Sequence, residues 1–578
     1  MSELWDENPH AAAPADLADR EPDEVLRKSS AGTVAAGIFT SRIIGFVRER
    51  AVAHFFGVGA HADVLQVAFR GPNILQNLLG EGTISAAFIP IYSRMIEEGR
   101  AEDAGRFAGA IFGLLLAAAS ALSLLGFLLA EPIVAIFTPG FLDDASKVAA
   151  GELAIDRYRL AAQAVRIMFP MTGVLVLSAW CLGVLNSHRK FFLPYFAPVL
   201  WNVAIIAGLI LGAHLIFEPG MDVRTLEGVT SSALSRLLFA GFFGALIGGL
   251  LQFLVQLPLV IHVLKGFRVS FSTRVKGVRE AIGAFGPVVA GRGVYQLSSY
   301  LDLLLASFLA AGAVASLRYA QMLYVLPVSL FGLSVAASEL PELSRFSKER
   351  IGPFLRRLSR SMNQMLFLTV PTLIGYLIFG FLIVGAIFRT GSFDLNDSWL
   401  VYLVLAGYSL GLLATTMSRL LQNAFYALND TKTPAKIAVL RVVVSTVIAV
   451  PMMFLLDRYS VATTAGFEAG ADPLFLGAVG LALGATGGAW LELWQLTRSL
   501  RSRVDGFTLP WPSVKRMTGT ALLAAAPSAV IWALLPAWHV ALKALVVLLV
   551  YVFIYFGASH LQDAPEMHTW SGRVQGKK

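Results

Sequence analysis

The chain has 578 residues, of which 56% are hydrophobic and 15% charged, with a formal net charge of +8. Soluble domains carry roughly 25% charged residues, so this composition indicates a membrane protein and excludes an ordinary soluble enzyme. The basic residues lie in short segments between apolar runs, where they set membrane orientation, so the charge does not indicate nucleic-acid binding. Cys181 is the only cysteine, which excludes an internal disulfide and a thiolate metal cluster.

The amino-terminal segment differs from everything that follows it. It is acidic, rich in Ala, Pro and Asp, and lacks the basic and apolar regions of a secretory signal peptide. We therefore predict that residues 1–30 form a disordered cytoplasmic tail.

Apolar segments long enough to cross a membrane recur along the rest of the chain. A crossing helix needs about 20 residues, and the candidates begin near Thr33, Val64, Phe107, Leu160, Leu193, Ala233, Ala281, Ala315, Met362, Ser398, Ile437, Pro473, Thr518 and Val540. The sequence thus predicts an all-α polytopic membrane protein with about 14 transmembrane helices.

The connections between these segments alternate in charge. Every second connection is basic, as in 94–106, 265–279 and 345–360, whereas the others are short or carry acids such as Asp143 and Asp144. Cytoplasmic loops are enriched in Lys and Arg. The alternation predicts an even number of helices with both termini in the cytoplasm.

The first two predicted helices contain charges that are costly at membrane depth and are therefore usually functional. Arg42 and Arg48 are about 9 Å apart along a helix axis, with Gly45 between them on the same side. Because guanidinium groups bind phosphate oxygens bidentately, this pair can hold a phosphate group. The alternative for Arg48, with its neighbours Glu49 and Arg50, is that it extends toward the membrane surface.

The second predicted helix contains Gly71-Pro72-Asn73 in its middle. Proline removes a backbone hydrogen bond, so we expect a kink or break there, of the kind that lines transporter cavities. Glu81 follows about two turns later. It is a candidate for pairing with an arginine of the first helix, for gating or for ion coupling, and the alternative is a purely structural salt bridge.

Polar side chains also recur on the seventh helix. Arg292, Gln296, Ser299 and Asp302 share one face, which predicts a water-filled cavity beside them. Arg318 and Gln321 add a similar pair on the eighth helix, and Arg419 lies near the cytoplasmic end of the tenth. Arg419 either forms part of an inner gate or extends toward the membrane surface.

No cofactor or metal site is predicted, because the chain has no P-loop, HExxH motif or paired GxGxxG, and its histidines have no ligand spacing. We therefore predict a transporter that is not an enzyme and that is driven by an ion gradient, the membrane potential or the gradient of its substrate. A non-transporting membrane scaffold would need neither buried arginines nor a broken helix.

Several long motifs resemble those of one known family. They read SRIIGFVRE (41–49), ADVLQVAFRGPNILQNLLGEGTISAAFIP (62–90), TPGF (138–141), LNSHRKFFLPYFAPVLWN (185–202), LLQFLVQLP (250–258), ELPELS (339–344) and ALNDTKTPAK (427–436). In this order, across nearly the whole chain, they resemble the MurJ/MviN family of lipid II flippases, within the superfamily of multidrug and polysaccharide exporters.

The resemblance implies two six-helix lobes around a V-shaped central cavity, with two further helices forming a groove for a lipid tail. The expected divisions are an N-terminal lobe at 31–265, a C-terminal lobe at 266–500, and a final helix pair with a cytoplasmic tail at 501–578. The family's essential first-helix arginines match Arg42 and Arg48, and other family positions match Asp63, Arg70, Glu81 and Arg419.

The function implied is the movement of lipid II to the outer leaflet of the bacterial inner membrane by alternating access. The expected substrate-binding residues are Arg42, Arg48, Arg70, Asn73, Arg292, Gln296 and Arg318, and those for gating or ion coupling are Asp63, Glu81, Asp302 and Arg419. Expected partners are lipid II, membrane lipids and a coupling ion, Na⁺, H⁺ or Cl⁻, for a monomeric protein. The alternatives are a flippase for another lipid-linked oligosaccharide and a cation-coupled drug exporter of the same fold.

The sequence departs from the family where some members have further cavity arginines. This chain has Gln76 and Asn77 after the Pro-Asn motif and Met322 before the proline of the eighth helix. Arg292 and Arg318 can restore positive charge to the same cavity.

This compensation makes a prediction. Replacing Arg292 with Ala should reduce complementation of a flippase-depleted bacterial strain by about tenfold or more, because a charge-assisted hydrogen bond to phosphate is lost. Colony counts at matched protein level in the membrane provide the measurement. Full complementation by Arg292→Ala would exclude the compensation.

Overall fold

The computed structural model describes residues 22–562 except 219–225, 227, 345–350, 467–472 and 537, and it also describes residues 564 and 566. These residues form helices, together with one isolated bridge between Ser460 and Phe475. An all-α membrane fold was predicted, and it is confirmed.

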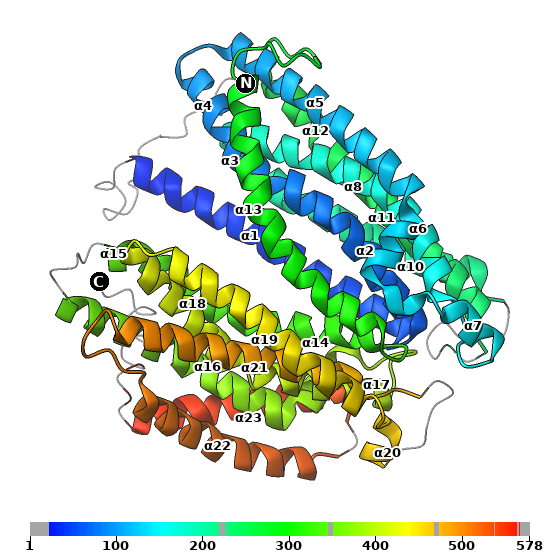
Figure 1. The fold of residues 1–578 in the computed structure, drawn as a ribbon, viewed down its shortest axis with the longest axis vertical. Helices are drawn as coiled ribbons and strands as arrows, with labels where there is room; N and C mark the ends of the chain where they lie inside the picture. The colour runs from blue at the N-terminus through cyan, green and yellow to red at the C-terminus, as the bar shows by residue number, and fades with distance from the viewer. Residues whose placement is uncertain are drawn as a thin grey trace, which may run out of the picture.

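The first group of helices, here called the N-terminal bundle, forms the upper part of Figure 1. It contains α1 (Pro22–Phe56), α2 (Ala60–Leu79), α3 (Glu81–Ala87), α4 (Ile89–Glu97), α5 (Ala101–Leu128), α6 (Ala130–Phe137), η1 (Pro139–Phe141), α7 (Asp144–Ala149), α8 (Arg157–Ser187), α9 (Phe192–Phe196), α10 (Pro198–Ile216), α11 (Ser231–Leu254) and α12 (Leu257–Val263). Helix α8 lies at its centre and packs against α2, α5 and α11, while α1 packs against α9 and α10.

The second group, the C-terminal bundle, lies below it in Figure 1. It contains α14 (Ala313–Pro327), η2 (Val328–Leu333), α15 (Ser334–Ser344), α16 (Ile351–Phe388), α17 (Leu395–Ser409), α18 (Leu412–Ala427), α19 (Lys432–Leu456), α20 (Val461–Ala465) and α21 (Gly477–Arg501). The last two helices, α22 (Trp511–Leu534) and α23 (Val540–Leu561), pack against each other and against α16.

Helix α13 (Val278–Ser307) runs between the two bundles (Figure 1). It contacts α2 and α3 of the N-terminal bundle as well as α14 and α21 of the C-terminal bundle. Near its start, Glu280 accepts a hydrogen bond from Arg94 of α4 at 2.9 Å, and both side chains are more than half exposed. The predicted lobe boundaries at 265 and 500 remain predictions.

The number of membrane crossings also remains a prediction. Every predicted segment begins in a helix or shortly before one. Among the described residues, nine helices are long and apolar enough to cross a membrane, or ten if the bent pair α17 and α18 is one span. Helices α1, α2 and α13 are not among the nine, and the first two carry the buried acids Glu49 and Asp63.

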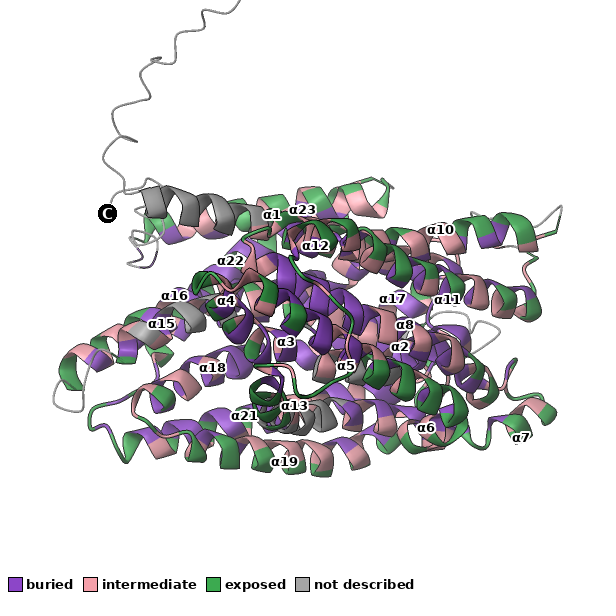
Figure 2. Ribbon diagram, turned by 90° about the horizontal axis from the view of Figure 1, so that it is seen from above, coloured by how far each residue is buried: buried purple, intermediate pink, exposed green. Residues whose placement is uncertain are grey.

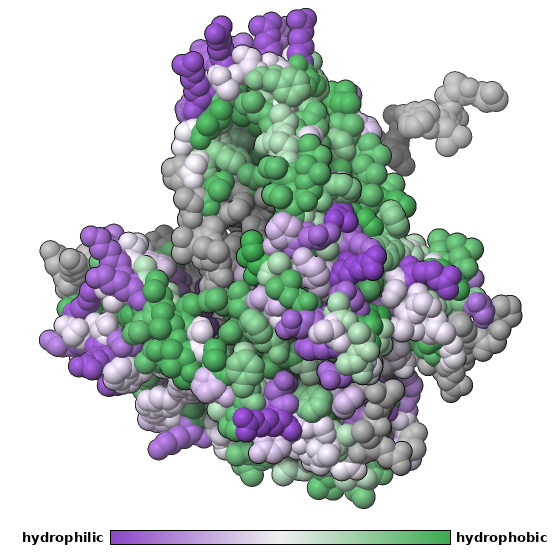
Figure 3. Space-filling model, turned by 45° about the vertical axis from the view of Figure 1, so that its right-hand side comes forward, coloured by the Kyte–Doolittle hydropathy of each residue, from purple (hydrophilic) through white to green (hydrophobic). Residues whose placement is uncertain are grey.

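The surface and the interior fit a membrane environment. Buried residues gather where helices face each other, and exposed residues lie on the outer faces (Figure 2). Large apolar side chains are exposed on those faces, including Leu215 at 86% and Phe553 at 79%. Figure 3 shows broad hydrophobic surface interrupted by hydrophilic groups. Because water would disfavour such surfaces, they are expected to contact lipid tails.

Helix α2 corrects one prediction. The expected interruption at Pro72 does not occur as a break, because α2 continues from Ala60 to Leu79. The chain leaves the helical conformation at Gly80 (φ −85°, ψ −147°), and a Cβ atom there would lie 2.1 Å from the carbonyl oxygen of Gln76. A proline inside a helix can be accommodated by bending, whereas the backbone at Gly80 excludes any side chain.

Two family motifs form matching turns in the two bundles. Arg189, after α8, and Asn429, after α18, both adopt a left-handed backbone conformation with φ of 57° and 60°. In each turn an amide bonds back across five residues, from Lys190 to Leu185 and from Asp430 to Phe425, at 2.9 Å. Hydrogen bonds from Thr433 and the adjacent guanidinium of Arg503 lower the pKa of Asp430 to about 2.

The bundles meet around the turn between α1 and α2, at the end of the molecule where α17 lies (Figure 1). Val58 N donates to Asp397 Oδ2 of α17 at 2.9 Å, and Ser392 N donates to the carbonyl oxygen of His54 at 2.8 Å. Gly57 (φ 53°) permits this contact, because a Cβ atom would lie 2.7 Å from Asp397 Oδ2. We call this region the closed end.

Candidate functional site: a cationic central cavity

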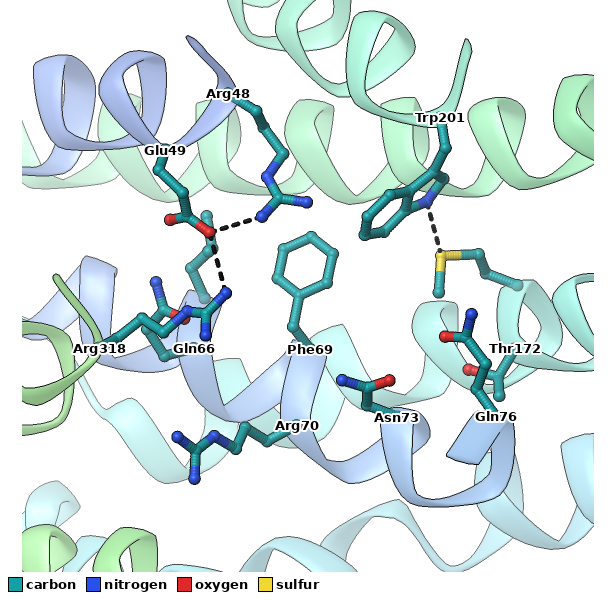
Figure 4. A pocket seen from close by; sticks show the side chains of 12 residues that line it. Arg48, Glu49, Gln66, Phe69, Arg70, Asn73, Gln76, Thr172, Trp201 and Arg318 are labelled. Carbon is teal, nitrogen blue, oxygen red and sulfur yellow. Dashed lines mark hydrogen bonds and ion pairs between the residues drawn. The ribbon is translucent and has the colours of Figure 1, made fainter. Parts of the chain in front are cut away.

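Two adjoining cavities lie between α1, α2, α8, α10 and α14. The larger, about 480 Å³, is lined by Arg42, Gly45 and Arg48 of α1 and by residues of α8, α10 and α11. The smaller, about 210 Å³, is lined by Arg48, Arg70, Asn73 and Arg318, among others (Figure 4). Arg48, Gln76 and Trp201 line both, so they form one continuous site, here called the central cavity.

Arg48 is held firmly at the junction of the two cavities. Its Nη1 donates to Asn202 Oδ1 at 3.0 Å and its Nη2 to Glu49 Oε1 at 2.5 Å. The guanidinium also lies 5.1 Å from the ring centre of Trp201 and 5.9 Å from that of Phe69. These contacts orient the charge toward the cavity instead of the membrane surface.

Glu49 is a candidate site residue that the sequence did not single out. Its carboxylate lies between two arginines from different bundles, since Oε1 also accepts from Arg318 Nη2 at 3.4 Å (Figure 4). The side chain is 5% exposed, and Oε2 is buried without a hydrogen-bond partner among the described residues. The adjacent pair Arg48-Glu49 in the sequence was a signal for an ion pair. The sequence could not reveal that Arg318 would also contact Glu49.

Gly45 leaves open space on α1 between Arg42 and Arg48. The nearest atom to a Cβ placed there is Asn202 Oδ1, at 4.0 Å. Arg42 is exposed, whereas the side chain of Arg48 is 14% exposed. The two cations therefore flank a gap in the cavity wall.

Helix α2 supplies the opposite wall of the smaller cavity. Arg70 Nη2 donates to Gln321 Oε1 of α14 at 3.1 Å, and its carbonyl oxygen accepts from Tyr300 of α13 at 3.1 Å. Asn73 and Gln76 follow at one-turn spacing and line the same space. Gln76 thus occupies the cavity wall as a neutral side chain, whereas Met322 lines neither part of the cavity.

Asp302 and Arg419 do not line the central cavity. Asp302 faces a separate cavity of about 210 Å³, which is also lined by Gln321, Tyr408 and Arg441. Arg441 is already paired with Glu492 at 2.6 Å. Arg419 is half-buried on α18.

Asp63 lies at the closed end, completely buried. Its carboxylate accepts from the backbone amides of Gly312 at 2.8 Å and Ala315 at 2.9 Å, at the start of α14. It also accepts from Arg157 Nη1 at 3.2 Å, and Asp144 holds that arginine through Nε at 2.6 Å. The negative charge thus faces the positive end of a helix from the other bundle.

The side chains of Glu81, Asn77, Arg292 and Gln296 lie outside the described residues. Their backbones belong to α3, α2 and α13.

Among the described side chains, the central cavity combines four arginines with one carboxylate, so it suits an anionic group. Within the described part of the chain, no group of three or more His, Cys, Asp or Glu side chains is placed to hold a metal ion. Helical bundles around a cationic cavity define a polytopic membrane transporter.

The fold is similar to that of a solved lipid II flippase MurJ in an inward closed conformation. The TM-score is 0.67 at 22% identity, with 91% of this chain and 98% of that chain covered. It is also similar to an inward-facing multidrug resistance transporter of the MATE family, in the MOP superfamily, with a TM-score of 0.54 and 14% identity over 80% of this chain and 94% of that one. At these identities the likeness shows the fold alone.

The sequence comparisons are more specific. A family model described as lipid II flippase MurJ matches residues 52–554, so the chain belongs to the MurJ family. A probable lipid II flippase MurJ from Haemophilus influenzae is 29% identical, covering 86% of this chain and 90% of the relative. One from Rhizobium tropici is 31% identical, covering 74% and 76%. The resemblance seen in the sequence motifs is confirmed.

The position of Glu49 makes a prediction about anion binding. Replacing Glu49 with Gln keeps the shape of the side chain but removes the negative charge beside Arg48 and Arg318. Inorganic pyrophosphate should then bind about tenfold more tightly, because an opposing charge within a few ångströms is lost. Isothermal titration calorimetry of the purified protein measures this, with Glu97→Gln, an exposed position on α4, as the control. Unchanged or weaker binding to Glu49→Gln would contradict this account of the cavity.

Proposed function

We propose that this chain is a lipid II flippase, which moves the lipid-linked peptidoglycan precursor across the bacterial inner membrane without catalysing a chemical reaction. The observation that carries this proposal is the convergence of Arg42, Arg48, Arg70 and Arg318 on one cavity. Relatives covering most of the chain are named lipid II flippases, which supports the same substrate.

The chemistry of lipid II fits a cavity of this kind. Its diphosphate and sugar-peptide headgroup cannot cross about 30 Å of hydrocarbon unaided. Arginines bind phosphate oxygens bidentately and stay charged in a partly buried site. In our proposal Arg42 and Arg48 hold the diphosphate across the gap at Gly45, and Asn73 and Arg70 contact the polar headgroup. Arg292 and Gln296 of α13 are proposed to complete the site.

Alternating access requires the closed end to open while the other end closes. We assign the closed end to the outer side of the membrane, with both termini in the cytoplasm, because the basic segments 94–106, 265–279 and 351–360 belong to the opposite side. Asp63 then acts as an outer latch, because its bonds to Gly312 and Ala315 join the two bundles. Glu49 acts as an inner link, since binding of a diphosphate competes for Arg48 and Arg318.

Asp302 is the proposed ion-coupling residue. The cavity beside Asp302 is separate from the central cavity. Gln321 lines the Asp302 cavity and also accepts a hydrogen bond from Arg70 at 3.1 Å. A cation or proton at Asp302 can therefore influence Arg70 through one side chain. Glu81 and Arg419 are proposed for gating, and the protein is proposed to work as a monomer.

A flippase for another lipid-linked oligosaccharide is the second candidate function, because the same arginines would bind its diphosphate. A cation-coupled drug exporter is disfavoured, since a cationic cargo would be repelled by four arginines.

The proposed diphosphate site makes a direct prediction. Replacing Arg42 and Arg48 together with Ala should weaken lipid II binding about 100-fold, because each charged hydrogen bond contributes about 1.5–3 kcal/mol. Microscale thermophoresis on purified protein provides the measurement. The pair Arg268→Ala and Arg274→Ala, exposed and outside the cavity, is the charge-matched control. Equal binding by the two double variants would exclude the diphosphate site.

The proposed outer latch makes a second prediction. A Cys181→Ala background allows a reporter cysteine at Ala462, which is 6% exposed and lines a cavity at the closed end. Replacing Asp63 with Asn weakens the bonds to Gly312 and Ala315, so a membrane-impermeant maleimide should label the reporter about tenfold faster in spheroplasts.

The control for this experiment is Asp143→Asn, which removes an exposed acid near the same end of the molecule. It should leave the labelling rate unchanged. Equal rates in the Asp63 and Asp143 variants would mean that Asp63 does not hold the closed end together.

A further inference from the structure

A further cavity, about 840 Å³, lies in the C-terminal bundle and shares no residue with the central cavity. It is formed by the first part of α16, the connection between α21 and α22, and one residue after α23. The lining residues are Leu355, Arg356, Ser359, Arg360, Asn363, Gln364, Gly506, Phe507, Thr508 and Glu566. We call it the α16 pocket.

Helix α16 presents a polar stripe to this pocket. Arg356, Ser359, Arg360 and Asn363 are spaced by three or four residues, which places them on one helix face. Both arginines are exposed, and neither makes an ion pair or hydrogen bond within the described residues. Their neighbour Arg357, by contrast, points elsewhere and pairs with Glu339 at 2.6 Å. The pocket therefore holds two uncommitted cations about one helical turn apart.

The other polar groups of the pocket fit a ligand with a negative charge and a hydroxyl group. Glu566, the one carboxylate among the described lining residues, is paired with Arg516 at 2.6 Å. The Oδ1 atom of Asn363 is buried and has no hydrogen-bond partner in the described part of the chain. A buried acceptor without a donor is costly, so a ligand hydroxyl group would stabilise it.

The pocket lies at the depth expected for lipid headgroups. Helix α16 has 38 residues, about 57 Å, which exceeds the hydrocarbon thickness of about 30 Å. Arg356 and Arg360 lie in its first turns, and the connection from α21 to α22 is at the same end of the molecule as α15 (Figure 1). Trp511, which begins α22, is 41% exposed, and tryptophan is enriched at membrane interfaces.

Helix α22 follows the pocket-lining connection in the chain, packs against α16 and exposes apolar side chains. Along α22, Leu522 and Leu523 are 47% and 66% exposed. Acyl chains can lie along this face while the headgroup stays in the pocket. A free anion in the cytoplasm would have no use for that surface.

We propose that the α16 pocket binds the headgroup of an anionic, hydroxyl-bearing phospholipid of the bilayer. The phosphodiester lies between Arg356 and Arg360, a headgroup hydroxyl donates to Asn363 Oδ1, and the acyl chains follow α22. This site is distinct from the central cavity and does not depend on the transported substrate.

The test uses purified full-length protein in nanodiscs made of equal parts phosphatidylcholine and phosphatidylglycerol. Native mass spectrometry after release counts the lipids that stay bound. Replacing Arg356 and Arg360 with Gln should weaken phosphatidylglycerol binding about 25-fold, since each basic residue near an anionic lipid surface contributes about fivefold. The control, Arg268→Gln with Arg274→Gln, removes the same charge from exposed positions in the N-terminal bundle.

A second variant keeps both charges but fills the pocket. Thr508→Trp places a large ring at an exposed lining position and should also abolish the bound phosphatidylglycerol. The proposal would be overturned if the arginine variant and its control retained equal amounts of phosphatidylglycerol, or if the unaltered protein retained phosphatidylcholine as well as phosphatidylglycerol. Displacement of the bound lipid by inorganic phosphate would also overturn it. The experiment measures phospholipid occupancy and not transport. A negative result would therefore leave the proposed flippase function unaffected.

Discussion

A charge inside a membrane protein must face a partner, a cavity or water, because an isolated one costs several kcal/mol. This constraint organises the structure around Glu49. The carboxylate lies between Arg48 of α1 and Arg318 of α14, so one acid contacts cations from two bundles. The same link keeps both arginines at the cavity wall without neutralising the site, because the cations outnumber the acid. Cavity charge and contact between the bundles are therefore coupled.

A second set of buried charges lies close to this link, because Asp63 binds the first turn of α14 and Arg318 follows one turn later. Asp63, Arg157 and Asp144 lie almost fully out of contact with solvent, and Asp63 also binds the backbone at the start of α14. Breaking a buried pair on one side is strongly destabilising, so such a set favours discrete open and closed states over intermediate ones. Gly57 permits the close approach of the α1–α2 turn to α17, since any side chain there would collide with Asp397.

The charges of the α16 pocket obey the same constraint in a different way. Arg357 and Arg516 are paired with acids, whereas Arg356 and Arg360 are exposed toward a cavity. Cations at the headgroup level are inexpensive because water and lipid phosphates reach them. The central cavity and the α16 pocket thus place arginines for two different anions, one deep between the bundles and one at the membrane surface.

The sequence by itself determined the membrane class, the family and the all-α fold, because hydrophobic length and long motifs are local properties of the chain. It also indicated Arg42, Gly45 and Arg48 as one helix face, because helical geometry relates residues that are close in sequence. Only the tertiary structure revealed that Glu49 meets Arg318 and that Asp63 binds the start of α14. It also moved the interruption of the second helix from Pro72 to Gly80. These partners are about 250 residues or more apart, so they are brought together only by helix packing, which sequence spacing does not predict.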